Sequence, residues 1–128
     1  MDFHGIATSF VQSYYSKFDA GISRRVSLAD MYRPESILSW ESTQSKGGTD
    51  ILAALSKPDM ANVKHDLSTT DAQPSPGGGV LVSVTGTLAL DDTTANPLRF
   101  SEVFNLQPVP DQAGSFFVSN QIFRMVFA

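Results

Sequence analysis

The segment DFHGIATSFVQSYYSKFDAG, residues 2–21, decides the fold. Its apolar residues recur at alternating steps of three and one, which is the period of a helix with one buried face. These residues are Phe3, Ile6, Ala7, Phe10, Val11, Tyr14, Tyr15 and Phe18. Asp2 stands where a carboxylate caps the first turn of a helix. Because the apolar stripe is rich in aromatic rings, we expect it to pack into a concave partner such as a curved sheet.

The next segments contain further helical signals and then turn signals. Residues 22–33 predict a second helical stretch that ends before Pro34, because a residue that precedes proline avoids the helical conformation. A glycine-rich loop is expected at 45–48 and a short helix at 50–56. The run PSPGGG at 74–79 predicts a hairpin loop.

The remaining segments have the patterns of strands. Strands are expected at 37–41, 61–72, 80–90, 99–109 and 115–127. Gly86 indicates a bulge where a long strand bends. Helices first and strands afterwards predict an α+β domain. We expect a strongly bent, mostly antiparallel sheet that wraps around the long N-terminal helix and the shorter helices and encloses a conical, apolar cavity. A length of 128 residues fits one domain over residues 1–128.

Composition and charge disfavour several classes of protein. The chain has 41% hydrophobic and 17% charged residues, as a globular domain does. It has no cysteine, which excludes disulfides and thiolate sites and fits an intracellular address. A net charge of −4 disfavours a nucleic-acid partner, because that binding depends on Lys and Arg. Without a long apolar run or a signal-peptide pattern, we expect no membrane insertion. The acidic stretch 61–98 favours a basic protein partner.

Residues that could carry out catalysis or bind a metal are few. The only histidines are His4 and His65, which lack the spacing of metal ligands, so we predict no metal site. No G-x-S-x-G motif is present. His65 and Asp66 are neighbours on an expected strand and point to opposite faces, so we interpret His65 as a hydrogen-bonded structural residue. The single Trp40 fits either a core position or the mouth of a pocket, and both interpretations stay open at this point.

Several motifs together resemble the nuclear transport factor 2 family, small import carriers of the GTPase Ran. They are FVQSYYSKFD (10–19), MYRPESILSWE (31–41), DAQPSP (71–76), VTGTLALDD (84–92), RFSEVFNL (99–106) and NQIFRM (120–125). The resemblance covers essentially the whole chain, and the fungal members look most similar. It implies a homodimer assembled through the sheets, no enzymatic activity and no cofactor.

The resemblance also implies two binding sites. The GDP form of Ran would place an aromatic side chain in the cavity, while its basic residues pair with an acidic rim. The rim positions here are Glu41, Asp91 and Asp92, and the cavity positions are Trp40, Val63, Leu98, Ile122 and Phe123. Phe3 matches the aromatic that binds phenylalanine-glycine repeats of nucleoporins. The implied location is the cytoplasm and nucleus, concentrated at the nuclear pore and envelope.

The sequence departs from the family pattern in three places. Pro58 and Met60 replace a leucine and an aromatic at one expected cavity wall, and Thr93 stands where some members are acidic. The loop at 21–27 is longer than the family pattern. Two alternatives stay open: an isomerase or dehydratase of the same fold, with an Asp or His base in the cavity, and a heterodimeric messenger RNA export cofactor.

Overall fold

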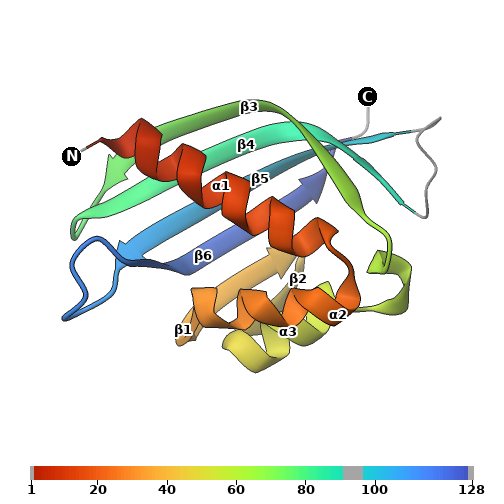
Figure 1. The fold of residues 1–128 in the computed structure, drawn as a ribbon, viewed down its shortest axis with the longest axis horizontal. Coiled ribbons are helices and arrows are strands. Elements are labelled where there is room, and N and C mark those ends of the chain that lie inside the picture. The colour runs from red at the N-terminus through yellow and green to blue at the C-terminus, as the bar shows by residue number, and fades with distance from the viewer. Residues whose placement is uncertain (1, 91–96, 127–128) are drawn as a thin grey trace.

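The computed structural model describes residues 2–90 and 97–126. The helical elements are α1 (Phe3–Asp19), α2 (Ile22–Arg25), η1 (Val26–Met31), α3 (Gly48–Leu55) and η2 (Pro58–Met60), of which η1 and η2 are 3-10 helices. The strands are β1 (Tyr32–Trp40), β2 (Thr43–Lys46), β3 (Lys64–Ser75), β4 (Gly79–Ala89), β5 (Leu98–Pro108) and β6 (Phe116–Met125). All the described helices lie on one side of a single curved sheet (Figure 1). This arrangement confirms the expected α+β class.

The sheet has the strand order β2-β1-β6-β5-β4-β3. Four of its five pairs are antiparallel, and only β1 and β6 run parallel. The long α1 crosses the concave face of β3 to β6, while α2, η1 and α3 lie in front of β1 and β2 (Figure 1). The parallel β1–β6 pair therefore joins the part of the sheet covered by the short helices, β1 and β2, to the antiparallel strands β3 to β6 covered by α1 (Figure 1).

The long helix forms and packs as its sequence predicts. The carboxylate of Asp2 accepts a hydrogen bond from the backbone N–H of Gly5 at 2.9 Å and so caps the first turn. The face of α1 that points to the sheet is buried: Ala7, Val11, Tyr14, Tyr15 and Phe18. It meets the inward side chains of the strands, including Val82, Val84, Phe100, Phe104 and Phe123. Burying each large apolar side chain contributes about 1.5–3 kcal/mol, so this contact dominates the core.

Three local expectations need correction. The helical stretch expected at 22–33 is divided into α2 and η1 and ends at Met31. β1 begins at Tyr32 rather than residue 37, because a register shift against β6 between Tyr32 and Ile37 accommodates Pro34 in the strand. The expected loop at 45–48 is partly strand, since β2 extends from Thr43 to Lys46.

The bulge lies opposite Gly86 rather than at it. The β3–β4 register shifts between Leu67 and Thr69, so the extra residue is in β3. A Cβ on Gly86 would collide with the carbonyl oxygen of Asp66 and approach Leu67. Glycine is therefore required because the backbone of the bulged strand approaches it closely.

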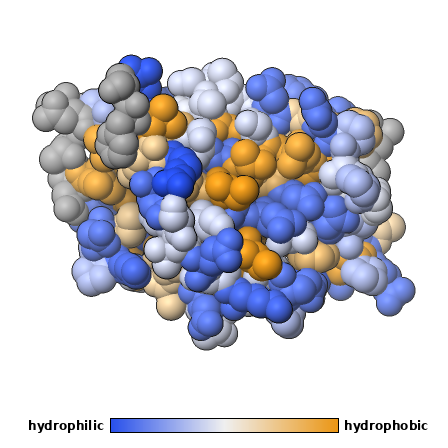
Figure 2. Space-filling view, turned by 180° about the vertical axis from the view of Figure 1, so that it is seen from behind, coloured by the Kyte–Doolittle hydropathy of each residue, from blue (hydrophilic) through white to orange (hydrophobic). Residues whose placement is uncertain are grey.

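The convex face of the sheet carries no described helix. Figure 2 shows apolar side chains gathered in the middle of this face among hydrophilic ones. Exposed apolar residues include Ile37, Leu81 and Ile122, the last with an exposed fraction of 50%. In the parts of the chain that the structure describes, no helix is long and apolar enough to cross a membrane.

Candidate functional site

An aromatic stack occupies the end of the parallel strand pair. Trp40, the last residue of β1, lies beside Phe123 of β6. Their ring centroids are 3.8 Å apart and their planes differ by 7°. Phe123 is fully buried and stacks in turn on Phe100, with centroids 5.8 Å apart. Trp40 is only half-buried, so its indole covers the core and still presents surface outward.

A pocket of about 230 Å³ opens beside this stack. It is lined by Trp40, Glu41, Thr43, Ser45, Ala54, Lys57, Asp59 and Met60. Its walls therefore come from the end of β1, from β2, from α3 and from the segment around η2. The pocket is therefore lined by apolar side chains together with both acidic and basic ones. An apolar ring with charged neighbours is the kind of group that such a pocket can bind.

Glu41 belongs to the tight turn between β1 and β2. Glu41 and Ser42 have φ angles of 51° and 75°, the values of a two-residue hairpin turn that favours Asn and Gly. The backbone N–H of Glu41 donates to the carbonyl of Phe123 at 3.1 Å. Its Oε1 accepts from the backbone N–H of Met125 at 2.5 Å. The turn therefore holds this carboxylate at the edge of the pocket, against the end of β6.

The other residues predicted for the cavity are more dispersed. Val63 is buried just before β3, and Leu98 is half-buried at the start of β5. Neither belongs to the pocket lining given above. Ile122 lies on the convex face, because neighbouring strand residues point to opposite sides and Phe123 points inward. Its expected place in the cavity is therefore corrected.

Several other residues predicted for binding lie outside the described part of the chain or away from the pocket beside Trp40. Asp91 and Asp92 of the expected rim, and the departure Thr93, lie outside the described residues. Phe3 is half-buried in the first turn of α1 and packs against the core. Of the two departures from the family pattern in the expected wall, Met60 does line the pocket and Pro58 begins η2.

A buried polar cluster connects α1 to the sheet, and it was not predicted from the sequence. Glu102 accepts hydrogen bonds from Tyr15 Oη at 2.7 Å and from Gln121 Nε2 at 2.6 Å. The Gln121 amide also donates to Tyr14 Oη at 2.8 Å and accepts from Tyr32 Oη at 2.6 Å. Burial raises the pKa of Tyr14, Tyr15 and Tyr32 above that of a free tyrosine. These hydroxyls therefore remain protonated and act as hydrogen-bond donors and acceptors inside the core.

His65 lies next to this cluster with its side chain 2% exposed. Its Nδ1 is 2.7 Å from Asp19 Oδ1, and its backbone N–H donates to the other oxygen of the same carboxylate at 2.7 Å. Its ring centroid lies 4.6 Å from that of Tyr15. A buried histidine beside a tyrosine is what the enzyme alternative requires. Yet the pocket beside Trp40 is lined by neither of them, and the contacts of His65 fit the structural role predicted for it.

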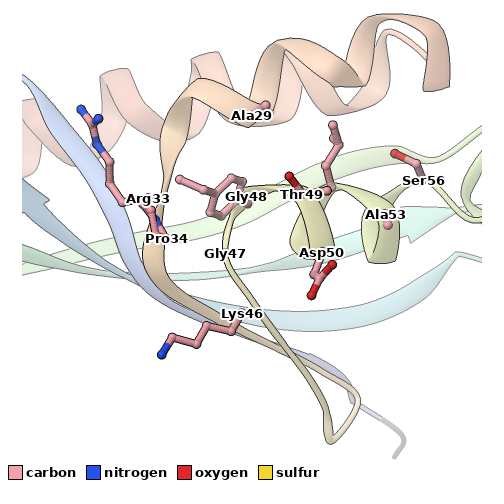
Figure 3. A pocket seen from close by; sticks show the side chains of 12 residues that line it. Ala29, Arg33, Pro34, Lys46, Gly47, Gly48, Thr49, Asp50, Ala53 and Ser56 are labelled. Atoms are coloured by element: carbon pink, nitrogen blue, oxygen red, sulfur yellow. The ribbon is translucent and has the colours of Figure 1, made fainter.

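A larger hollow lies elsewhere, between η1, the start of β1, the end of β2 and α3. It measures about 760 Å³ and is lined by residues from β1, β2 and α3, among them Arg33, Lys46, Gly48 and Asp50. Figure 3 shows Arg33 and Lys46 extending outward from this hollow. It contains none of the residues predicted for binding. Within residues 2–90 and 97–126, no three His, Cys, Asp or Glu side chains are grouped so that they could hold a metal ion.

Comparison with known proteins identifies the family. The model of the nuclear transport factor 2 domain matches residues 6–125. The chain belongs to the nuclear transport factor 2 family. Nuclear transport factor 2 of Kluyveromyces lactis is 42% identical over 129 residues, covering 100% of this chain and 98% of that protein. The protein of the same name from Saccharomyces cerevisiae is 43% identical over the same length and coverage.

A solved structure agrees with this assignment. The structure of nuclear transport factor 2 from Cryptosporidium parvum superposes with a TM-score of 0.85 at 38% sequence identity, covering 97% of this chain and 94% of that one. The family and its α+β fold with a curved sheet, both expected from the sequence, are confirmed. The names of these relatives support a role in nuclear transport, which is not an enzymatic one.

Two charged residues of the pocket and one buried arginine were not predicted from the sequence. Lys57 and Asp59 bring charges of opposite sign to the pocket, but in the sequence they were only neighbours of Pro58 and Met60. Arg25 was not singled out in the sequence, yet it is completely buried. Its partners are backbone carbonyls of other helical elements, and such contacts leave no pattern in the residues around an arginine.

Proposed function

We propose that this chain is a nucleocytoplasmic carrier that binds the GDP form of Ran through the pocket beside Trp40. The observation that carries the proposal is the half-buried indole of Trp40, stacked on Phe123 and open to a pocket of about 230 Å³. An aromatic side chain of the partner enters this pocket and continues the stack. Burying such a ring contributes about 1.5–3 kcal/mol, and stacking adds about 0.5–1.5 kcal/mol.

Charge around the pocket supplies orientation. Glu41 lies at the edge of the pocket, and Asp91 and Asp92 complete the proposed acidic rim. Pairing with basic residues of Ran contributes about 1 kcal/mol or less per exposed pair and speeds the encounter. A partner that withdraws its aromatic side chain when it exchanges nucleotide loses the larger contribution, so binding depends on the nucleotide.

Nucleoporin binding and location complete the proposal. Phe3 provides an apolar contact for phenylalanine-glycine repeats at the start of α1, next to the half-buried Ile6. Binding there is weak and fast, as movement through the pore requires. The protein moves between cytoplasm and nucleus and concentrates at the nuclear pore and envelope.

The proposed assembly is a homodimer through the convex sheet face. Ile37, Leu81 and Ile122 are exposed on this face, and a second copy would remove them from water. A heterodimeric export cofactor is the competing interpretation of the same surface, and the oligomeric state of the isolated chain separates the two.

Calorimetric titration with Ran tests the proposed carrier function. We expect binding to Ran loaded with GDP and none to Ran loaded with a GTP analogue. Glu41→Gln removes the charge but keeps an oxygen that accepts the hydrogen bond from Met125, so we expect about fivefold weaker binding from a loss of about 1 kcal/mol. Glu35→Gln, an exposed change of the same kind in β1, is the matched control.

Two results would contradict the proposal. Absence of binding to both nucleotide forms would redirect attention to small molecules in the pocket, as the enzyme alternative requires. Equal binding to both forms would remove the nucleotide dependence that a Ran-GDP carrier needs.

A further inference from the structure

Arg25 is a fully buried arginine whose described hydrogen bonds all go to backbone carbonyls. Its exposed fraction is 0%. Its Nε and Nη2 donate to the carbonyl of Phe18 at 3.1 and 2.9 Å, and its Nη1 donates to the carbonyls of Leu55 and Met60, both at 2.8 Å. The guanidinium carbon lies 4.1 Å from the centroid of the Phe18 ring. Among the residues that the structure describes, the one ion pair is His65 with Asp19, so backbone oxygens supply the hydrogen bonds to Arg25.

These three carbonyls belong to the ends of three helical elements. Phe18 lies in the last turn of α1, Leu55 is the last residue of α3, and Met60 is the last residue of η2. Carbonyls in the last turn of a helix lack partners within it, and the helix dipole there favours a cation. One guanidinium therefore satisfies three such ends at once and joins them.

The same contacts extend to the pocket beside Trp40. Ala54, Lys57, Asp59 and Met60 form its wall on the side of α3 and η2. The described backbone-to-backbone hydrogen bonds of residues 56–61 join residues close in sequence, such as Met60 N–H to the carbonyl of Lys57 at 2.8 Å. The side chain of Arg25, by contrast, links the carbonyl of Met60 to α2. This wall is therefore held by the apolar packing of Leu55 and Met60 in the core and by the hydrogen bonds from Arg25 to their carbonyls.

We propose that Arg25 is the positioning residue of the Trp40 pocket, fixing the wall from Ala54 to Met60 opposite the aromatic stack and so setting the width that admits the aromatic ring of the partner. This inference rests on the proposed function for its binding consequence. Arginine is suited to the task because its planar group offers five donors in a fixed geometry, whereas lysine offers a single point charge.

The experiment compares Arg25→Lys with Arg24→Lys, the same change at an exposed neighbouring position. Trp40 is the only tryptophan of the chain, so quenching of its fluorescence by acrylamide reports on the pocket alone. We expect Arg25→Lys to keep the native circular dichroism spectrum and to at least double the quenching constant. We also expect about tenfold weaker binding to Ran loaded with GDP. Arg24→Lys should change neither value.

The outcomes for Arg25 and for the proposed function are separable. If the unmodified protein fails to bind Ran, the proposed function fails, while the quenching comparison still tests the wall. A folded Arg25→Lys protein whose acrylamide quenching constant equals that of the unsubstituted protein would overturn the inference. If Arg25→Lys does not fold, Arg25→Gln, which keeps two donors, replaces it. Loss of the fold in both variants would also overturn the inference, because Arg25 would then hold the whole fold rather than one wall.

Discussion

Glu102 is a carboxylate in the centre of the molecule whose described hydrogen bonds come from neutral groups. Its partners are the Tyr15 hydroxyl and the Gln121 amide. Burial raises the pKa of Glu102 above its ordinary value, while those two hydrogen bonds and the charge of His65 act in the opposite direction. The folded protein therefore holds a proton on Glu102 at higher pH than the unfolded chain does. Stability falls as the pH rises from the unfolded value of about 4.5 through the raised folded value.

Glu102→Gln tests this linkage at the residue that causes it. The glutamine side chain keeps the shape of glutamate and loses the charge. Its carbonyl oxygen can accept from Gln121, and its NH2 group can donate to the Tyr15 hydroxyl. We expect the free energy of unfolding at pH 7.5 to increase by about 1–3 kcal/mol, because the cost of burying this carboxylate is removed. Urea unfolding from pH 4 to pH 8 is the measurement.

The matched control is Glu35→Gln, on the exposed surface of β1. It should leave both the stability and its pH dependence unchanged. If Glu102→Gln lowers the stability at pH 7.5, the hydrogen bonds from Tyr15 and Gln121 stabilise the carboxylate by more than its burial costs.

For single residues, the sequence predicted which side chains lie together better than it predicted which ones are buried. Trp40 and Phe123 were expected in one cavity, and the structure stacks them. Ile122 was expected beside them, but the period of two in a strand turns it to the convex face. The burial of Glu102 was not predicted. The period of two places it on the same face as the buried Phe100 and Phe104, but a charged side chain is seldom fully buried.

The elements followed from the sequence where a local signal was strong. The stripe and cap of α1 predicted its bounds to within a residue, and the glycines after Pro76 predicted the β3–β4 hairpin. The β1–β2 hairpin was missed because its turn uses Glu41 and Ser42 at positive φ, where glycine or asparagine is the usual signal. Tertiary contacts with β6 hold that turn, and such contacts leave no local pattern.

Gly86 gives a prediction for the β3–β4 pair. Gly86→Ala places a methyl group against the carbonyl of Asp66, so the bulge must open and ladder hydrogen bonds lengthen. We expect a loss of about 2–3 kcal/mol in the free energy of unfolding, measured by urea titration. Ser83→Ala, on the exposed side of the same strand, should change it by less than about 0.5 kcal/mol. A Gly86→Ala protein of unchanged stability would mean that the two strands separate there without cost.

The molecule as a whole has one covered and one uncovered sheet face. The uncovered face brings Val103 beside Ile122 on neighbouring strands, next to a polar bridge from Asn105 to Asn120 of 3.1 Å. Apolar side chains in the middle with polar groups around them are typical of a protein interface. This face is where the proposed homodimer can be tested.

Ile122→Asp should dissociate the homodimer. About half of the Ile122 side chain is already buried in the single chain, so the dimer gains about half of the 1.5–3 kcal/mol of full burial from each copy. Losing this contribution from two copies weakens association at least about tenfold. Sedimentation velocity at micromolar concentration measures the change. Val26→Asp makes the same substitution at a residue that is 62% exposed on the helical side, and it should leave the dimer intact. An unmodified chain that sediments as a monomer would contradict the homodimer.

The parallel pairing of β1 with β6 matters for synthesis on the ribosome. Tyr32 pairs with Val118, and Trp40 with Phe123, so more than eighty residues must be translated between the two partners. A nascent chain that has emerged only as far as β5 leaves the inner edge of β1 unpaired and Trp40 without the ring on which it stacks. Contacts between such distant segments form late and slowly. The growing polypeptide therefore exposes this strand edge during most of its translation, and the pocket beside Trp40 is completed only when β6 has left the exit tunnel.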